Sequence, residues 1–292
     1  MISIIIPTYN RSCMLREAIE SVLQQRDIET EIIVVDDNST DNTLEVMKKY
    51  PQIIYLKNNV NKGPGYSRLF GYTCSKGEYI VFMDDDDYYI VNTFFCDAVK
   101  ILDCDLSLSL VAGNSFIKKE PQQALEESPM NISGFISGLK YLNGFQFKYS
   151  KPHSTFNAVL RKSSLEKAEL RNMKMVNDAS IYMRALTVGN IYLFDENIGV
   201  YRVHSNNISK SLDYKFLIAN LIEKESIFYI IKEKLKYPQL WWFQQFRLIY
   251  NYFLWTNPSI EDKKSLIKWG KIHFNESYLL YIYLLFKAIQ LK

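Results

Sequence analysis

The sequence of 292 residues is poor in the residues that build zinc sites and disulfide frameworks. It has 4 cysteines and 3 histidines, and no two cysteines stand in a C-x-x-C spacing. Three of the cysteines fall in apolar, helix-like surroundings, which predicts buried free thiols in a reducing compartment. We therefore expect neither a cysteine-based zinc site nor a disulfide framework.

Export signals and long apolar runs are also missing. The first residues, MISIIIPTYN, contain no basic segment followed by a long apolar core, so we expect no signal peptide. The longest apolar run near the end of the sequence, residues 278–286, is about half of the roughly 20 residues that a membrane span needs. The expected localisation is cytoplasmic.

Two common nucleotide motifs are absent. After the first apolar run the chain reads PTYN and not G-x-G-x-x-G, and no G-x-x-x-x-G-K-[ST] loop follows elsewhere. Gly63 and Gly65 in KGPG are a weak phosphate signal that a plain turn explains equally well. The net charge is only +3, although residues 209–292 hold 13 Lys and Arg against 7 Asp and Glu. This modest excess, without a nucleic-acid motif, predicts no nucleic-acid partner.

Short apolar runs alternate with amphipathic segments four times within the first ninety residues. The runs predict strands that are buried on both faces, and the segments between them predict helices. The alternation predicts an α/β fold with a doubly wound, mostly parallel sheet. The expected strands span residues 3–6, 32–35, 53–56 and 78–83, and Ser12 is the expected N-cap of the first helix.

Polar clusters follow each expected strand, where ligands of such sheets bind. We expect one crevice to be lined by Thr8–Arg11, Asp36–Asp37, Asn61–Arg68 and Asp84–Asp87. Four adjacent aspartates after a buried strand need a compensating positive charge, most simply a divalent cation with oxygen ligands. The alternative is a polar loop in which one Asp caps the next helix.

Taken in order and at these intervals, the motifs resemble the family 2 glycosyltransferases of the GT-A, Rossmann-like fold. They are SIIIPTYNR at 3–11, IIVVDDNSTDNT at 32–43, NKGPGYSRLFG at 61–71 and IVFMDDDD at 80–87, followed by NDASIYMRAL at 177–186 and VYRVHSNNIS at 200–209. The resemblance covers roughly residues 1–209. It implies a nucleotide-binding half at 1–115, an acceptor-binding half at 116–209, and a C-terminal helical extension at 210–292.

The resemblance implies roles for the residues in the nucleotide-binding half. Thr8 and Tyr9 would line the nucleobase pocket, and Asp37 would accept a hydrogen bond from the imide N–H of uracil. Arg68 would meet the base or the pyrophosphate. Asp84 would hold the ribose with Asp85 beside it, and Asp86 would bind Mn²⁺ or Mg²⁺. Because four aspartates are adjacent, Asp85 and Asp87 form an equally good DxD pair.

Residues of the acceptor-binding half complete the implied site. The family usually has Glu-Asp where this sequence has Asn177-Asp178, and Asp178 would be the catalytic base. The simpler reading of Asp178 is an N-cap for the following helix. His204 would contact the metal or the diphosphate, with Arg202 as a supporting cation, or else it is structural. His153 is expected in a surface loop. It directly follows a less regular region, residues 118–152, which is either an acceptor-binding or mobile loop region or a tolerated insertion.

The implied function is an inverting, metal-dependent glycosyltransferase of the hexosyltransferase type. It would move a sugar from a nucleotide-sugar donor, a UDP-sugar, to a saccharide or lipid-linked saccharide acceptor in a growing bacterial surface glycan. The alternatives are a sugar nucleotidyltransferase and a non-catalytic partner in a glycan-assembly complex. The aromatic, basic helices of 210–292 predict peripheral contact with the inner face of the cell membrane, packing on the core, or a homo-oligomer interface.

Overall fold

The computed structural model describes residues 1–121, 124–204, 214–255, 258–273 and 283. The chain divides into two compact units, Met1–His204 and Ser205–Lys292, and each is described by itself. The boundary expected after residue 209 lies outside the described residues and stays a prediction. The apolar run at 278–286 also lies outside them, except for Tyr283.

The first unit is built on one mixed sheet with the strand order β3-β2-β1-β4-β9-β6-β10-β5. Parallel pairs join β1 to β2 and β4, β2 to β3, and β6 to β10, whereas β9 runs antiparallel between β4 and β6. Two short strands, β7 and β8, pair with β6 and β10. The strands are β1 (Ile2–Thr8), β2 (Thr30–Asp36), β3 (Ile54–Lys57), β4 (Tyr79–Phe82), β5 (Tyr88–Tyr89), β6 (Leu108–Lys119), β7 (Leu125–Glu126), β8 (Gly134–Ile136), β9 (Ala158–Arg161) and β10 (Asn190–Val203).

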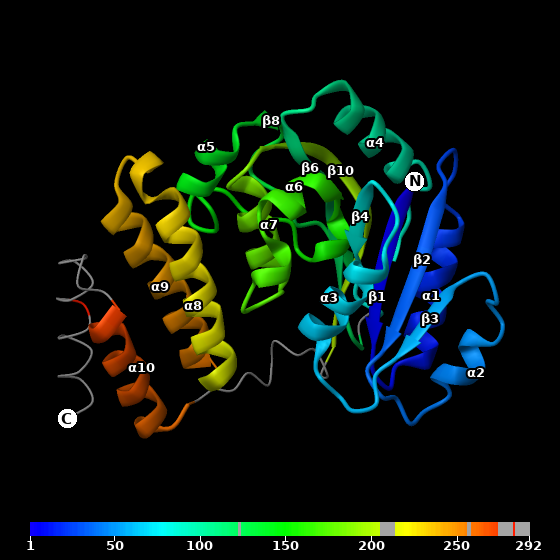
Figure 1. Cartoon of the computed structure of the whole chain (residues 1–292), viewed down its shortest axis with the longest axis horizontal. Helices are drawn as coiled ribbons and strands as arrows, with labels where there is room; N and C mark the ends of the chain where they lie inside the picture. The colour runs from blue at the N-terminus through cyan, green and yellow to red at the C-terminus, as the bar shows by residue number, and fades with distance from the viewer. Residues whose placement is uncertain (122–123, 205–213, 256–257, 274–282, 284–292) are drawn as a thin grey trace. The chain divides into compact units, whose positions relative to one another are not determined.

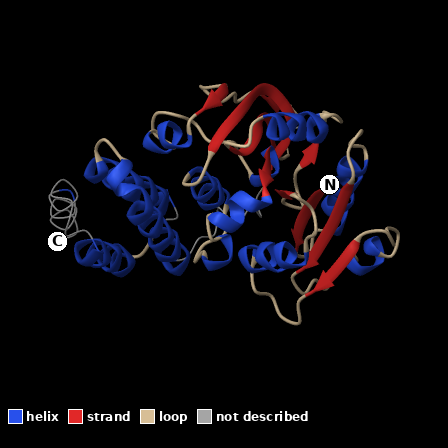
Figure 2. Cartoon of the chain, turned by 45° about the horizontal axis from the view of Figure 1, so that its top comes forward, coloured by secondary structure: helices blue, strands red, loops and turns tan. Residues whose placement is uncertain are grey.

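Helices cover both faces of this sheet (Figures 1 and 2). The apolar side chains of α1 join the core cluster formed by alternate residues of β1, including Ile4 and Ile6. Helix α3 packs on the other face, against Ile5, because successive side chains of a strand point to opposite faces. The helices are α1 (Ser12–Leu23), α2 (Thr43–Met47), α3 (Pro64–Cys74), α4 (Phe94–Cys104), α5 (Gly138–Asn143), α6 (Lys162–Lys167) and α7 (Asp178–Leu186).

The four predicted strands are confirmed as β1 to β4, and the predicted α/β architecture is confirmed with them. The predicted N-cap at Ser12 is wrong, because α1 begins at Ser12 and Arg11 occupies the cap position without a side-chain bond. Asp41, from the loop after β2, accepts the Ser12 N–H at 3.0 Å instead. A loop distant in sequence therefore supplies the cap.

The expectation of buried cysteines holds for Cys96 and fails for two others. All four thiols are free, but Cys13 and Cys104 are exposed. Cys13 lies on the face of α1 that also exposes Glu17 and Glu20, and Cys104 lies on the face of α4 that also exposes Lys100.

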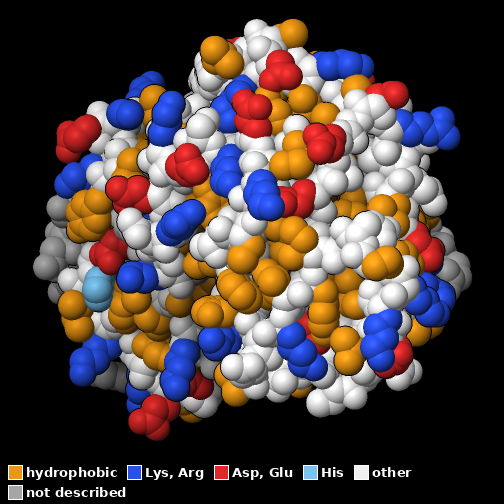
Figure 3. All heavy atoms as spheres, turned by 45° about the vertical axis from the view of Figure 1, so that its right-hand side comes forward, with side chains coloured by type: hydrophobic (Ala, Val, Ile, Leu, Met, Phe, Trp, Pro, Cys, Tyr) orange, Lys and Arg blue, Asp and Glu red, His pale blue; other side chains and the backbone are white. Residues whose placement is uncertain are grey.

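The second unit is helical, as predicted. It contains α8 (Tyr214–Ile231), α9 (Pro238–Trp255) and α10 (Ile260–His273). Phe228 of α8 stacks on Trp241 and Trp242 of α9, and both tryptophans are buried. None of the helices in the described ranges combines the length and the apolar character that a membrane span requires. On the face of the chain in Figure 3, Lys and Arg side chains are interspersed with Asp and Glu.

Candidate active site

The ends of β1 and β4 meet at the carboxyl edge of the parallel strands. The Thr8 hydroxyl donates to Asp85 Oδ2 at 2.7 Å. Arg11 Nη1 donates to Asp85 Oδ1 at 3.0 Å and to Asp86 Oδ2 at 2.8 Å. Two of the polar clusters predicted to share a crevice are therefore in direct contact, although more than 70 residues separate them.

The four aspartates face two ways. Asp85 turns toward Thr8 and Arg11, whereas Asp84, Asp86 and Asp87 each offer a carboxylate oxygen within 4.8 Å of the others. Asp87 Oδ1 accepts the Arg202 N–H at 3.2 Å, and its Oδ2 is buried without a hydrogen-bond partner. Three converging carboxylate oxygens fit the hard-cation chemistry of Mn²⁺ or Mg²⁺.

Burial and mutual repulsion raise the pKa values of Asp84, Asp85 and Asp87. Burial and the Asp86 charge raise the pKa of Asp85 to about 7, against the opposing influence of Arg11 and Thr8. Burial, with Asp86 and Asp84, raises the pKa of Asp87 well above its usual range. Burial also raises the pKa of Asp84, although Arg68 opposes it. Protons held here compete with a cation for the same oxygens.

His204 lies beside the aspartate cluster. Its Nε2 is 2.9 Å from Asp86 Oδ2, and the side chain is buried. Its role as a metal or diphosphate ligand stays a prediction. The Arg202 guanidinium pairs with Glu17 and lies 4.7 Å from the centre of the Tyr88 ring, while its backbone N–H bonds Asp87.

Asp37 organises the loop that leads into α3. Its Oδ1 accepts the Lys62 N–H and Asn58 Nδ2, both at 2.8 Å, and its Oδ2 accepts the Gly63 N–H at 2.7 Å. Gly63 has φ +83°, which a residue with a side chain rarely adopts. The predicted contact of Asp37 with uracil stays a prediction. Of the two other residues predicted to line the nucleobase pocket, Thr8 is buried and Tyr9 is 47% exposed.

Arg68 connects the two halves of the site. It is buried on α3, forms an ion pair with Asp84, and donates from Nη1 to Val176 O at 3.0 Å. Val176 lies two residues before Asp178. The guanidinium therefore ties the aspartate cluster to the segment that enters α7.

Asp178 does not cap α7. Asn177 Oδ1 accepts the Ser180 N–H at 2.9 Å, so Asn177 is the N-cap and Asp178 is the first helical residue. Asp178 Oδ1 accepts the Ala179 N–H at 2.7 Å, and Lys151 forms an ion pair with Oδ2. Burial opposes ionisation of Asp178, but Lys151 and the Ala179 N–H outweigh it and lower the pKa of the carboxyl. The capping alternative for Asp178 is therefore wrong.

Sequence reasoning assigns no individual role to two residues of the site, Arg11 and Lys151. Arg11 lies in the motif at 3–11, and Lys151 lies in the less regular region 118–152. The expected surface position of His153 is also wrong. Its ring is half-buried, stacks on Tyr201 at 5.9 Å, and bonds the hydroxyls of Ser115 at 3.0 Å and Ser128 at 3.2 Å.

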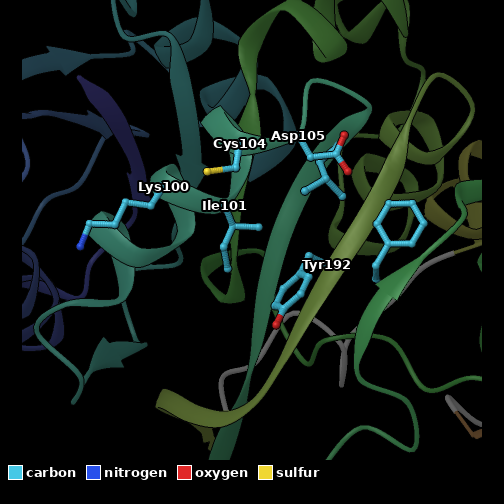
Figure 4. A pocket seen from close by; sticks show the side chains of 7 residues that line it. Lys100, Ile101, Cys104, Asp105 and Tyr192 are labelled. Atoms are coloured by element: carbon cyan, nitrogen blue, oxygen red, sulfur yellow. The ribbon is translucent and has the colours of Figure 1, made fainter.

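A separate groove of about 340 Å³ lies between α4 and the beginnings of β6 and β10 (Figure 4). Strand β9 is antiparallel to both β4 and β6, so β4 and β6 run in the same direction. The groove lies at the beginning of β6 and the aspartates follow the end of β4, so the two are at opposite edges of the sheet. Its lining is mainly apolar and includes Ile101, Leu108 and Tyr192. It plays no part in the site above.

Comparisons with known proteins agree with this geometry. Residues 3–167 match the family described as Glycosyl transferase family 2. The chain is 27% identical over 207 residues to the GalNAc(5)-diNAcBac-PP-undecaprenol beta-1,3-glucosyltransferase of Campylobacter jejuni, covering 69% of this chain and 64% of that protein. It is 29% identical over 220 residues to the UDP-Glc:alpha-D-GlcNAc-diphosphoundecaprenol beta-1,3-glucosyltransferase WfaP of Escherichia coli, covering 72% and 80%. The chain thus spans less than two thirds of the Campylobacter protein.

Solved structures support the fold. S. aureus TarS 1-349 in complex with UDP-GlcNAc superposes with a TM-score of 0.65 at 18% identity, covering 99% of this chain and 88% of that chain. The mannosyltransferase PcManGT from Pyrobaculum calidifontis, in complex with GDP-Man and Mn²⁺, gives a TM-score of 0.53 at 14% identity, covering 99% and 86%. With more than half of its residues matching the family, this chain belongs to Glycosyl transferase family 2.

Proposed function

We propose that this chain is an inverting, metal-dependent glycosyltransferase, and that it transfers a sugar from a UDP-sugar to a lipid-linked saccharide acceptor of a growing bacterial surface glycan. The observation that carries the proposal is the position of Arg68, which pairs with Asp84 and bonds the backbone just before Asp178. Arg68 thereby links the proposed cation site for the donor diphosphate to the proposed base for the acceptor hydroxyl. The names of the Campylobacter and Escherichia relatives, which include undecaprenol-linked acceptors, support the acceptor class.

In this mechanism Asp84, Asp86 and Asp87 would hold the cation. When bound, Mn²⁺ or Mg²⁺ supplies Lewis-acid stabilisation of the leaving diphosphate. Asp178 takes the proton of the acceptor hydroxyl while the oxygen of that hydroxyl attacks the anomeric carbon of the donor sugar. The bond from that carbon to the diphosphate oxygen breaks, and its electron pair leaves with the nucleotide. A single displacement inverts the anomeric configuration.

Calorimetric titration with UDP, with and without Mn²⁺, tests the donor half of the proposal. We expect Mn²⁺-dependent binding that is selective for UDP over other nucleoside diphosphates and is lost in Asp86→Asn. Selectivity for another base would overturn the uracil contact of Asp37. Metal-independent binding of UDP without turnover of any donor would instead support the non-catalytic alternative.

The variant Asp178→Asn tests the acceptor half. Loss of a general base typically costs about 10²–10⁴-fold in rate, so we expect kcat to fall by that factor. Donor binding should persist, because Asp178 is not among the three converging carboxylates. An Asp178→Asn enzyme with the wild-type kcat would remove Asp178 from the mechanism.

We also propose that the protein is cytoplasmic and that its second unit makes a peripheral contact with the inner face of the cell membrane. The competing use of the second unit is a homo-oligomer interface. The turn between α8 and α9 supports the membrane contact. Tyr229 in the last turn of α8 and Tyr237 just before α9 are 52% and 60% exposed, and the ammonium groups of Lys232 and Lys236 lie over their rings. Exposed aromatic and cationic side chains in one turn suit an anionic lipid surface.

A further inference from the structure

Lys151 is fixed by all three of its N–H donors. Its ammonium donates to Pro152 O at 2.8 Å and to His153 O at 3.0 Å, and it pairs with Asp178 Oδ2. An ammonium has only three donors, so none remains for solvent. The Lys151 side chain is only 16% exposed, so this ion pair is better shielded from water than a surface pair.

The backbone around Lys151 is anchored on both sides. Before it, Ser150 O accepts the Tyr141 hydroxyl at 2.6 Å, and the Ser150 N–H donates to Asn131 Oδ1 at 2.9 Å. After it, the His153 ring stacks on Tyr201. The ammonium is therefore held in place by its own chain before any substrate arrives.

The Asp178 carboxylate is held from two directions. The Ala179 N–H fixes Oδ1 within the first turn of α7, and Lys151 fixes Oδ2 from a different part of the chain. Its other titratable neighbours act electrostatically: Arg68 and Asp84 on the donor side, and His153, Tyr182 and Tyr201 around α7 and β10. Lys151 bonds the carboxylate directly, whereas Arg68 bonds Asp84 and Val176 O.

We propose that Lys151 is the positioning residue of the catalytic base, keeping the Asp178 carboxylate ionised and in one orientation toward the acceptor hydroxyl. This inference rests on the proposed role of Asp178. A carboxylate oxygen has two lone pairs, so Oδ2 can accept the acceptor hydroxyl while it is bonded to Lys151. The lowered pKa of Asp178 agrees with this arrangement.

The test compares Lys151→Met with Lys151→Arg in the full chain, across pH. The readout is UDP release from UDP-glucose and from UDP-N-acetylglucosamine, with water as acceptor and Mn²⁺ present. We expect Lys151→Met to lower kcat about tenfold at pH 6, since a small misplacement of a catalytic group can cost up to about 100-fold. The difference in kcat between Lys151→Met and the wild type should narrow as pH rises. Loss of the cation raises the pKa of Asp178, which moves the acid limb of the pH–rate profile to higher pH.

Two comparisons separate positioning from structure. Lys151→Arg keeps the cation and should keep the acid limb near that of the wild type, and calorimetric binding of UDP with Mn²⁺ should be unchanged in both variants. If Lys151→Met fails to fold, Lys151→Gln replaces it, because it is neutral and still polar. A wild-type acid limb and kcat in the folded neutral variant would overturn the inference. The Asp178→Asn variant tests the proposed function separately, because an active Asp178→Asn enzyme would show that Asp178 is not the catalytic base.

Discussion

Asn177 shows how a single residue departs from a family pattern without disturbing the site. The family usually carries an acidic residue there, and this chain has an amide. Asn177 adopts extended backbone angles and caps α7 with its side-chain oxygen, which is a role that Asn fills well. The helix therefore starts at Asp178, whose carboxylate is left to pair with Lys151.

At the same scale, the raised pKa of Asp85 predicts how the metal-free protein responds to pH. Its value of about 7 lies above the ordinary 3.8, so the folded state binds a proton that the unfolded state has released. The stabilisation is complete below the ordinary value and is lost as pH rises through about 7. We expect the metal-free Tm to fall between pH 5.5 and pH 8 in thermal melts.

Adding Mn²⁺ should reverse this trend, because the cation competes with protons for the same cluster. We expect Mn²⁺ to raise the Tm more at pH 8 than at pH 5.5. The Asp86→Asn protein is the control, since it loses one predicted ligand and should show a smaller increment at both values. Equal Mn²⁺ increments at the two pH values in the wild type would contradict the assignment of the cluster.

At the scale of the element, the close packing of α3 on the sheet depends on the absence of a side chain at Gly71. A Cβ added at Gly71 would lie 2.5 Å from Ile5 Cγ2 and 3.2 Å from Val35 Cγ2. The substitution Gly71→Ala would push α3, and with it Arg68, away from β1. Overpacking of this kind costs about 1–3 kcal/mol, so we expect the free energy of unfolding in urea to fall by that amount.

Gly65→Ala in the same helix is the matched control. Its Cβ would meet Val176 O at 3.6 Å, which is ordinary contact. Since Ala is favoured over Gly in helices by about 1 kcal/mol, this protein should be at least as stable as the wild type. Similar losses in the two variants would show that helix contacts other than the Gly71 approach decide the position of α3.

At the scale of the whole molecule, the exposed tyrosines and lysines around the turn between α8 and α9 predict that the second unit binds anionic vesicles. We expect the full chain to sediment with vesicles of phosphatidylglycerol and phosphatidylcholine but not with phosphatidylcholine alone. Each lysine near an anionic surface contributes about 1 kcal/mol, so changing Lys232 and Lys236 to Gln should weaken binding roughly 30-fold.

The control changes Lys263 and Lys264 of α10 to Gln, which removes the same charge elsewhere in the unit. It should keep most of the binding if the turn is the contact. An equal loss in both variants would point to a diffuse charge effect. Failure to bind either vesicle, together with sedimentation of the protein as a dimer, would instead favour the homo-oligomer interface.

Features that depend on neighbouring residues were predictable from the sequence. The first four strands follow from short apolar runs, because burial on both faces demands apolar side chains at every position. The contact between the ends of β1 and β4 follows from topology, because parallel strands end at one edge of the sheet. These two rules, with the order of the motifs, were sufficient for the fold and the family.

The tertiary structure alone decided which side chains meet. In the loop after β4 no periodicity sets the direction of successive side chains, so only packing separates Asp85 from the three carboxylates that converge. Asp41 caps α1, and Lys151 pairs with Asp178 across 27 positions of the chain. Such pairs depend on how loops cross in space, and neither propensity nor spacing along the chain encodes that.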